Sequence, residues 1–140
     1  MKKIIFGTII LAFVFTTSCD REQNADFIQY NWKLQSVSEN GIIHAIHWSE
    51  ADLCIEDAYT LIFINDTIFQ LNTGVNKAMG IYHLSEANLE ISQYGEMTSV
   101  HSEDKIDQLL PKCIPTVHTY KIKGNSLILI GDGCRIRLTR

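Results

Sequence analysis

Residues 117–139, VHTYKIKGNSLILIGDGCRIRLT, contain three short runs of β-forming residues separated by two turn signals. The runs cover residues 117–122, 127–130 and 134–139. The turns contain Gly124 and the segment Gly131-Asp132-Gly133. Because short strands joined by glycine-containing turns pair as antiparallel hairpins, this stretch predicts a β-meander at the end of the chain.

The preceding part of the chain has the same character. Further strands are expected at residues 31–37, 42–48, 59–64, 67–71, 79–84, 88–92 and 97–100. Asn40-Gly41 and Asn65-Asp66 are turn signals between neighbouring strands. Strands this short and frequent are typical of an antiparallel barrel or sandwich. We therefore predict a mainly β fold, a small antiparallel β-barrel-like domain.

One segment, residues 102–110, has helical rather than strand periodicity. Ser102 is a candidate N-cap, and the two acidic residues after it suit a first helical turn. Apolar residues then recur from Ile106 to Leu110 at i, i+3 and i+4, and Pro111 is expected to end the helix. We expect one short α-helix that packs its apolar stripe on the sheet.

The N-terminus has the features of a secretory signal peptide. Two lysines precede an apolar run from Ile4 to Phe15. A helix of this length reaches about 18 Å, well short of the ~30 Å hydrocarbon core of a bilayer. Thr16-Thr17-Ser18 ahead of Cys19 is similar to a bacterial lipobox, although Thr16 stands where that pattern prefers Leu. We expect residues 1–18 to be a lipoprotein signal peptide and Cys19 to be the lipid-modified N-terminus of the mature protein, carrying fatty chains such as palmitate.

The residues after Cys19 predict a membrane-anchored location. Residues 19–30 are polar and acidic at first, and we expect them to form a tether to a domain at residues 31–140. Asp20 and Glu22 suit a lipoprotein sorting cue in bacteria with two membranes. Acyl chains on one cysteine make a firm anchor, since each buried CH₂ contributes about 0.8 kcal/mol. We expect the protein at the cell envelope, on the outer membrane, facing the periplasm or the cell surface.

The charge balance narrows the range of partners. The chain has 12 basic and 16 acidic residues, and the expected leader contains two of the basic ones, so the remaining 122 residues have a net charge of −6. This balance argues against a nucleic-acid partner, whose phosphates need Lys and Arg. It also argues against electrostatic adhesion to anionic lipid, so that acyl chains are the expected membrane contact.

Three cysteines follow Cys19, namely Cys54, Cys113 and Cys134. An odd number allows at most one internal disulfide, and the absence of a C-x-x-C pair argues against a redox motif or a zinc knuckle. In the predicted meander, strand 134–139 starts at nearly the same height along the sheet as residue 115. This weakly favours a Cys113–Cys134 pair, with Cys54 as the alternative partner for either.

Residues 74–82, GVNKAMGIY, resemble the G-C-N-x-x-x-G-x-Y signature of META/HslJ-like domains. Trp32 and Leu34 match the W-x-L that opens such domains, and residues 120–129 match their late hairpin. The resemblance covers residues 31–139. Two members of the family pattern are missing: Val75 and His101 stand where the family often has cysteines, so its disulfide is not carried over.

The resemblance implies a small β-barrel-like domain with one helix, found in bacterial envelope proteins and often in lipoproteins. No catalytic residue or cofactor is implied. The signature residues are expected to be structural: Trp32, Gly74, Asn76, Gly80 and Tyr82. The two glycines would allow close backbone approach, Asn76 would hydrogen-bond backbone in a turn, and Tyr82 would pack inward with its hydroxyl near an edge.

The sequence contains other residues that could in principle bind a metal ion or catalyse a reaction, but their patterns favour structural roles. His44 and His47 would lie on opposite faces of a strand and could not share a metal ion.

An acidic cluster surrounds Cys54 but lacks the glycine of a calcium loop, which favours a solvated loop or a docking surface for a basic partner. Its members are Glu50, Asp52, Glu56 and Asp57. Neither a G-x-S-x-G elbow nor a glycine-rich nucleotide loop is present. We predict no catalytic residue, no metal site, no cofactor and no enzymatic activity.

The sequence thus favours a lipid-anchored envelope protein with a non-enzymatic role: binding, or stabilising the envelope. Its partner would be an envelope protein or polymer. The alternative is a lipocalin-like carrier of a small apolar ligand, because antiparallel barrels of about eight strands can enclose one. A carrier would need a pocket lined by residues such as Ile62, Phe69, Leu71 and Tyr82.

Overall fold

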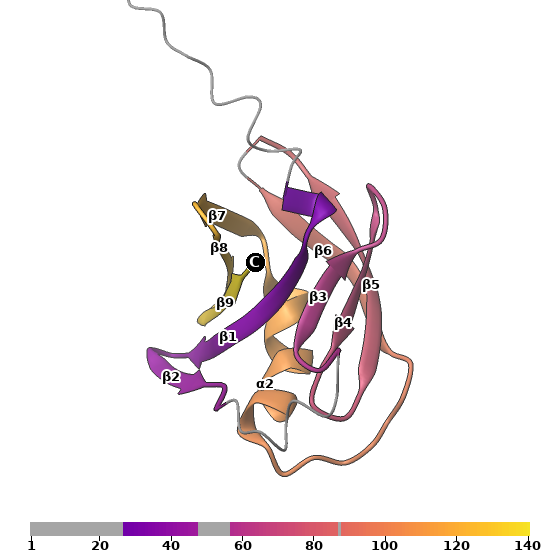
Figure 1. The fold of residues 1–140 in the computed structure, drawn as a ribbon, viewed down its shortest axis with the longest axis vertical. Helices are drawn as coiled ribbons and strands as arrows, with labels where there is room; N and C mark the ends of the chain where they lie inside the picture. Colours follow the sequence, from indigo (N-terminus) through magenta and orange to yellow (C-terminus); the bar gives the residue numbers. More distant parts are fainter. Residues whose placement is uncertain (1–26, 48–56, 87) are drawn as a thin grey trace, which may run out of the picture.

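A strongly curved antiparallel sheet wraps around one α-helix in this protein (Figure 1). The structure, a computed structural model, describes residues 27–47, 57–86 and 88–140. The strands are β1 (Asn31–Glu39), β2 (Ile42–Ala45), β3 (Thr60–Phe63), β4 (Ile68–Asn72), β5 (Lys77–Leu84), β6 (Leu89–Glu96), β7 (Thr119–Lys123), β8 (Ser126–Gly131) and β9 (Cys134–Thr139). The helix is α2 (Lys105–Cys113), and 3₁₀ turns occupy Phe27–Gln29 (η2) and Ile114–Thr116 (η4).

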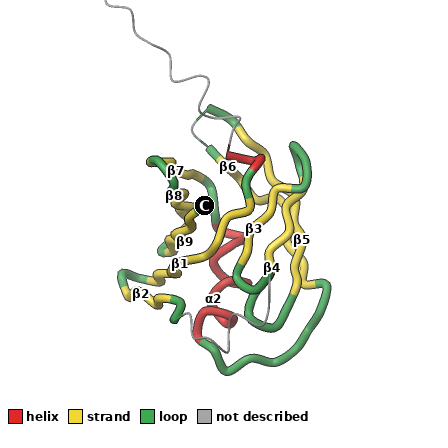
Figure 2. The backbone as a smooth tube through the Cα atoms, in the orientation of Figure 1, coloured by secondary structure: helices red, strands yellow, loops and turns green. Residues whose placement is uncertain are grey.

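The described strands follow the order β6-β5-β4-β3-β1-β9-β8-β7, with β2 paired to β1. The two ends of the sheet approach each other where the Ile91 amide donates to the Val117 carbonyl oxygen over 3.3 Å. The sheet is therefore a curled half-barrel with α2 inside its concave face (Figure 2). The predicted mainly β, barrel-like fold with one helix is confirmed.

Strand β1 organises the sheet because it pairs with β9 along most of its length and with β2 and β3 on its other edge. Trp32, Leu34 and Val37 point inward and are 0% exposed. The register shifts between Leu34 and Ser36, a β-bulge that returns Val37 to the inner face. Asn40 and Gly41, with φ of 50° and 83°, turn the chain from β1 into β2, as the Asn-Gly signal predicts.

Helix α2 supplies the other half of the core. Ile106, Leu109 and Leu110 are at most 5% exposed, and they belong to one hydrophobic cluster with Trp32 and Leu138. Burying a Leu or Ile side chain contributes roughly 1.5–3 kcal/mol, so this stripe holds the helix in the concave face.

The helix differs from its predicted bounds at both ends. It covers Lys105–Cys113 rather than 102–110, and its N-cap is Asp104, whose carboxylate accepts from the Ile106 amide over 2.7 Å. Ser102 instead donates to Asp107. Pro111 lies inside the helix and does not end it. A proline removes its own N–H bond and crowds the carbonyl group one turn before it, but the helix continues here to the Ile114 amide, which bonds to the Leu110 carbonyl.

Two strand predictions need correction. Strand β6 runs to Glu96, beyond the predicted end at residue 92, and residues 97–100 form a loop rather than a strand. The Met97 and Thr98 amides still donate to the Lys77 carbonyl oxygen of β5, but the backbone of Val100 bonds to the side chain of Asn76 instead of to a strand. The strand predicted at residues 42–48 is shorter: of its described residues, only Ile42–Ala45 form a strand.

The folded domain also begins earlier than expected. Phe27, placed in the predicted tether, is 2% exposed. Its carbonyl oxygen accepts from the Trp32 indole over 2.7 Å, and its ring lies 5.2 Å from that of Phe63 and 5.1 Å from that of Tyr120.

No helix among the described residues is long and apolar enough to span a bilayer. The predicted signal peptide and Cys19 lie outside the described residues.

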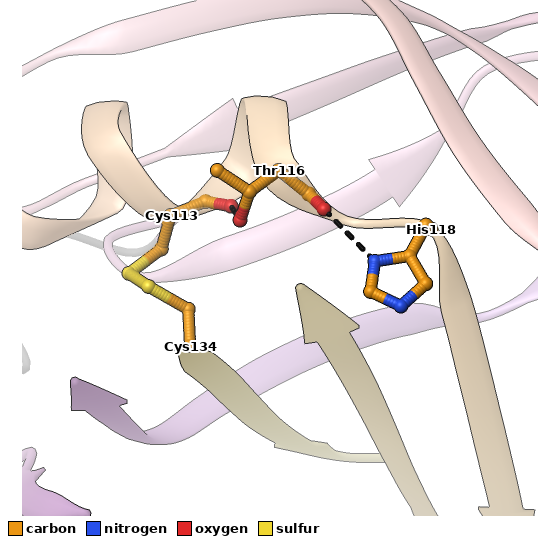
Figure 3. The surroundings of a disulfide bond; sticks show 4 residues. All are labelled: Cys113, Thr116, His118 and Cys134. Carbon is orange, nitrogen blue, oxygen red and sulfur yellow. Dashed lines mark hydrogen bonds between the residues drawn. A yellow bond between two sulfur atoms is a disulfide. The ribbon is translucent and has the colours of Figure 1, made fainter. Parts of the chain in front are cut away.

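A disulfide joins Cys113, at the end of α2, to Cys134, at the start of β9, with Cα atoms 5.6 Å apart (Figure 3). This is the pair that the meander favoured. The Thr116 hydroxyl donates to the Cys113 carbonyl oxygen over 2.8 Å, so the 3₁₀ turn after the helix is held beside the bond. The alternative partner, Cys54, lies outside the described residues.

We expect the double substitution Cys113→Ala/Cys134→Ala to lower the free energy of unfolding by about 3 kcal/mol, because the bond closes a loop of about twenty residues in the unfolded chain. Urea denaturation measures this change, with Cys54→Ala as the control that leaves the bond intact. Peptide mapping without reductant should recover the peptides of Cys113 and Cys134 linked. Recovery of either one linked to Cys54 would contradict the pairing.

Candidate functional site

The first candidate region is the signature segment, where Gly74 lies against the helix. The Gly74 amide donates to Oδ1 of Asp107 over 2.8 Å, and the Ser102 hydroxyl donates to Oδ2 over 2.6 Å. Asp107 is 8% exposed, and these two donors satisfy its buried carboxylate. A Cβ at Gly74 would lie 2.6 Å from the Tyr59 hydroxyl and 2.9 Å from Asp107. Only glycine leaves room for this contact between the β4–β5 loop and α2.

Asn76 ties the loop after β6 to the β4–β5 loop. Its Nδ2 donates to the Val100 carbonyl oxygen, and its Oδ1 accepts from the Val100 amide, both over 2.7 Å. The Thr98 hydroxyl also donates to Oδ1, over 3.1 Å. Three bonds to one 9% exposed side chain use most of its hydrogen-bonding capacity. Asn76 therefore contacts a loop 24 residues away instead of only its own turn.

Gly80 and Tyr82 complete the signature in β5. A Cβ at Gly80 would overlap the ring of Phe69, which lies directly against the glycine. Tyr82 is 1% exposed, and its hydroxyl donates to the Asn65 carbonyl oxygen over 2.6 Å. Burial, with a further contribution from Asp66, raises the pKa of Tyr82 above its ordinary value. The signature residues and Trp32 thus have packing or hydrogen-bonding partners inside the fold.

The other groups singled out in the sequence are not assembled into a site. His44 is half-buried on β2, and His47 is exposed. Among the described residues, these histidines and the other potential ligands form no cluster of three His, Cys, Asp or Glu side chains that could hold a metal ion. Within the acidic cluster only Asp57 is described, and it is exposed; Glu50, Asp52, Cys54 and Glu56 lie outside the described residues.

The residues named for a carrier pocket lie in packed positions. Phe69, Leu71 and Tyr82 are each 1% exposed and belong to the core cluster, and the Tyr82 ring packs edge-on against Phe63 at 5.0 Å. Ile62 is half-buried on β3. The concave face that an enclosed ligand would use is occupied by the apolar stripe of α2.

A groove of about 620 Å³ lies instead on the outer face of the sheet, across β1, β8, β9 and the β1–β2 hairpin. Its lining contains small, aliphatic and basic side chains: Ser36, Ser38, Asn40, Gly41, Ile43, Ile128, Ile130, Gly131, Gly133, Cys134, Arg135 and Arg137. We call this surface the outer groove.

Strand register explains why a groove forms there. One row across the sheet places Ile43 beside Ser38, Ser38 beside Arg135, and Arg135 beside Ile130. The next outward row places Ala45, Ser36, Arg137 and Ile128 in the same order. Paired residues project from the same face, so short serines on β1 lie between longer side chains on both sides. The serines form the floor, and the isoleucines and arginines rise around it.

The outer groove lies in a basic region of an acidic chain. On the outer face of β1, β7, β8 and β9, five exposed cations project from alternating positions: Lys33, Lys121, Lys123, Arg135 and Arg137. None of the outward positions of these four strands carries a carboxylate. The full chain has a net charge of −4. The fold therefore separates its charges and concentrates cations on one half of the sheet.

The sequence alone did not indicate this site. The alternation Arg135-Ile136-Arg137 was a usable signal, because it places both arginines on one face of a strand. The serines and isoleucines beside them come from β1, β2 and β8, and only the pairing register brings them to the arginines.

We expect Gly74→Ala to lower the free energy of unfolding by about 1–3 kcal/mol, because the new methyl group would have to displace Tyr59 or Asp107. Gly95→Ala is the matched control, since a Cβ there meets nothing within 4 Å. Thermal and urea unfolding of both variants measure the difference. Equal stability of the two would show that the contact between the loop and the helix tolerates a side chain.

Comparisons with known proteins agree with the fold. An NMR structure of a protein from Burkholderia xenovorans matches with a TM-score of 0.58 and 19% identity, over 79% of this chain and 80% of that one. A crystal structure of a DUF4847 family protein from Bacteroides vulgatus ATCC 8482 matches with a TM-score of 0.56 and 12% identity, over 81% and 94%. No curated protein matches by sequence.

The family model of the META domain matches residues 25–140, a range that includes Phe27 and the whole described sheet. This match confirms the resemblance carried by residues 74–82. The chain therefore belongs to the META domain family.

Proposed function

We propose that this META-domain protein is a lipid-anchored protein of the bacterial cell envelope, and that it binds a partner at the outer groove without transforming it chemically. The observation that carries the binding role is the outer groove itself: a 620 Å³ depression with two arginines and three isoleucines on an exposed sheet face. Concave surfaces with apolar walls and a few polar groups are the usual form of binding sites.

The filled interior supports a binding surface over a carrier. Helix α2 and the residues Phe69, Leu71 and Tyr82 occupy the space that an enclosed apolar ligand would need. A partner must therefore bind on the outside, where the outer groove is the largest of the hollows described for this domain.

The anchor would determine which end of β1 lies closer to the membrane. Eight residue steps separate Cys19 from Phe27, so the 3₁₀ turn η2 would begin at most about 29 Å from the acylated cysteine. Residues Ser36 to Gly41 lie at the opposite end of β1 from this turn (Figure 1). At about 3.4 Å per residue, that end is roughly 17–30 Å further along the strand. The outer groove would therefore lie at the end of β1 that is further from the anchor.

The anchor is tested by Cys19→Ala, which we expect to release the protein from the membrane fraction, because the acyl chains would be its main membrane contact. Fractionation of cells and mass spectrometry of the mature N-terminus measure the outcome. Cleaved Cys19→Ala protein that remains with the membranes would contradict the lipoprotein assignment. Cys54→Ala is the matched control, a cysteine substitution that leaves Cys19 in place.

The binding role is tested by placing a photo-crosslinking amino acid at Ser38, on the floor of the outer groove, in cells that make the protein at its native level. We expect a crosslinked product from Ser38 and none from Ser92, an exposed serine on β6 at the other end of the sheet. The absence of a product from Ser38, or the same product from both positions, would count against the outer groove as a binding site.

A further inference from the structure

The cations of the outer groove have no counterion among the described residues. Neither Arg135 nor Arg137 forms an ion pair or hydrogen bond with another described residue, and none of the residues lining the groove is acidic. The nearest carboxylate along the chain, Asp132, lies 3.8 Å from the imidazole of His118 at the end of the β8–β9 turn. A surface with unpaired arginines is complementary to an anion.

The spacing of the arginines restricts the form of that anion. They alternate on β9, and outward residues two positions apart in a strand are separated by about 6.5–7 Å. Side chains at alternate positions of any extended peptide have the same spacing. Each guanidinium can bind a carboxylate through two parallel N–H···O bonds. Two carboxylates at i and i+2 of an extended peptide therefore match Arg135 and Arg137.

The rest of the lining also suits a peptide. Ile130 and Ile128 lie beside Arg135 and Arg137 in the strand register, and Ile43, 71% exposed, forms the opposite wall. These side chains would cover the apolar parts of a peptide. The lining contains no aromatic ring, the usual platform for stacking bases.

From these observations we propose that the outer groove binds an extended acidic peptide segment with carboxylates at alternate positions, paired with Arg135 and Arg137. This proposal rests on the proposed function and specifies its partner. The segment lies over the outer face of β1 and β9, between Ile43 and the isoleucines of β8. Lys121 and Lys33 extend the positive field beyond the two contacts and attract the acidic segment.

The probe is a synthetic blocked peptide in which glutamate alternates with valine, titrated into the full mature protein in detergent micelles and followed by calorimetry. We expect the double variant Arg135→Glu/Arg137→Glu to weaken binding at least tenfold. The matched control Lys77→Glu/Lys105→Glu changes the net charge equally through exposed residues away from the outer groove, and should bind within about twofold of the wild type. Circular dichroism melts verify that both variants fold.

A second peptide with glutamine in place of glutamate separates charge recognition from apolar contact. Equal affinity for the two peptides, or equal loss in the two double variants, would overturn the proposal. A Ser38 crosslink to a polysaccharide or a phospholipid would also overturn it while leaving the binding role intact. If Ser38 crosslinks to nothing and neither peptide binds, the proposed function fails as well.

Discussion

The burial of α2 in the concave face of the curled sheet is the contact on which the remaining structure depends. Ile106, Leu109 and Leu110 close the core from the inside, and the disulfide at Cys113 fixes the end of the helix to β9. An open antiparallel sheet must cover its apolar face, and one helix is enough here because the sheet curls around it. The carboxylate of Asp107 then ties the helix to the β4–β5 loop through the Gly74 amide.

This arrangement decides where the protein can interact with other molecules. Because side chains fill the interior, the binding surface that we propose lies on the outer face of the sheet. Most outward positions on β1, β7, β8 and β9 are short, aliphatic or basic, and the bulge in β1 aligns Ser36 and Ser38 with the arginines of β9. A β-bulge near a candidate site is a common way to redirect side chains. The same bulge keeps Val37 in the core.

Local patterns predicted much of this fold. The Asn40-Gly41 turn, the C-terminal meander and the existence of one helix follow from neighbouring residues, whose conformational preferences act over a few positions. The errors arose where distant partners compete with local signals. Ser102 was predicted to cap the helix, but it bonds to Asp107, and Asp104 caps instead. Residues 97–100 have strand-like composition, but the backbone of Val100 bonds to the side chain of Asn76 instead of to a strand.

The sequence by itself determined the strand alternation, the family signature and the excess of acidic residues over basic ones. It also placed Arg135 and Arg137 on one face of a strand. The tertiary structure alone decided that this face is outward, that β1 supplies serines beside it, and that the outward positions of β1, β7, β8 and β9 carry no carboxylate. The physical reason is that a strand's own period determines which residues share a face, whereas the neighbours across the sheet depend on register. Register is set by long-range pairing and by bulges, which no short stretch of sequence contains.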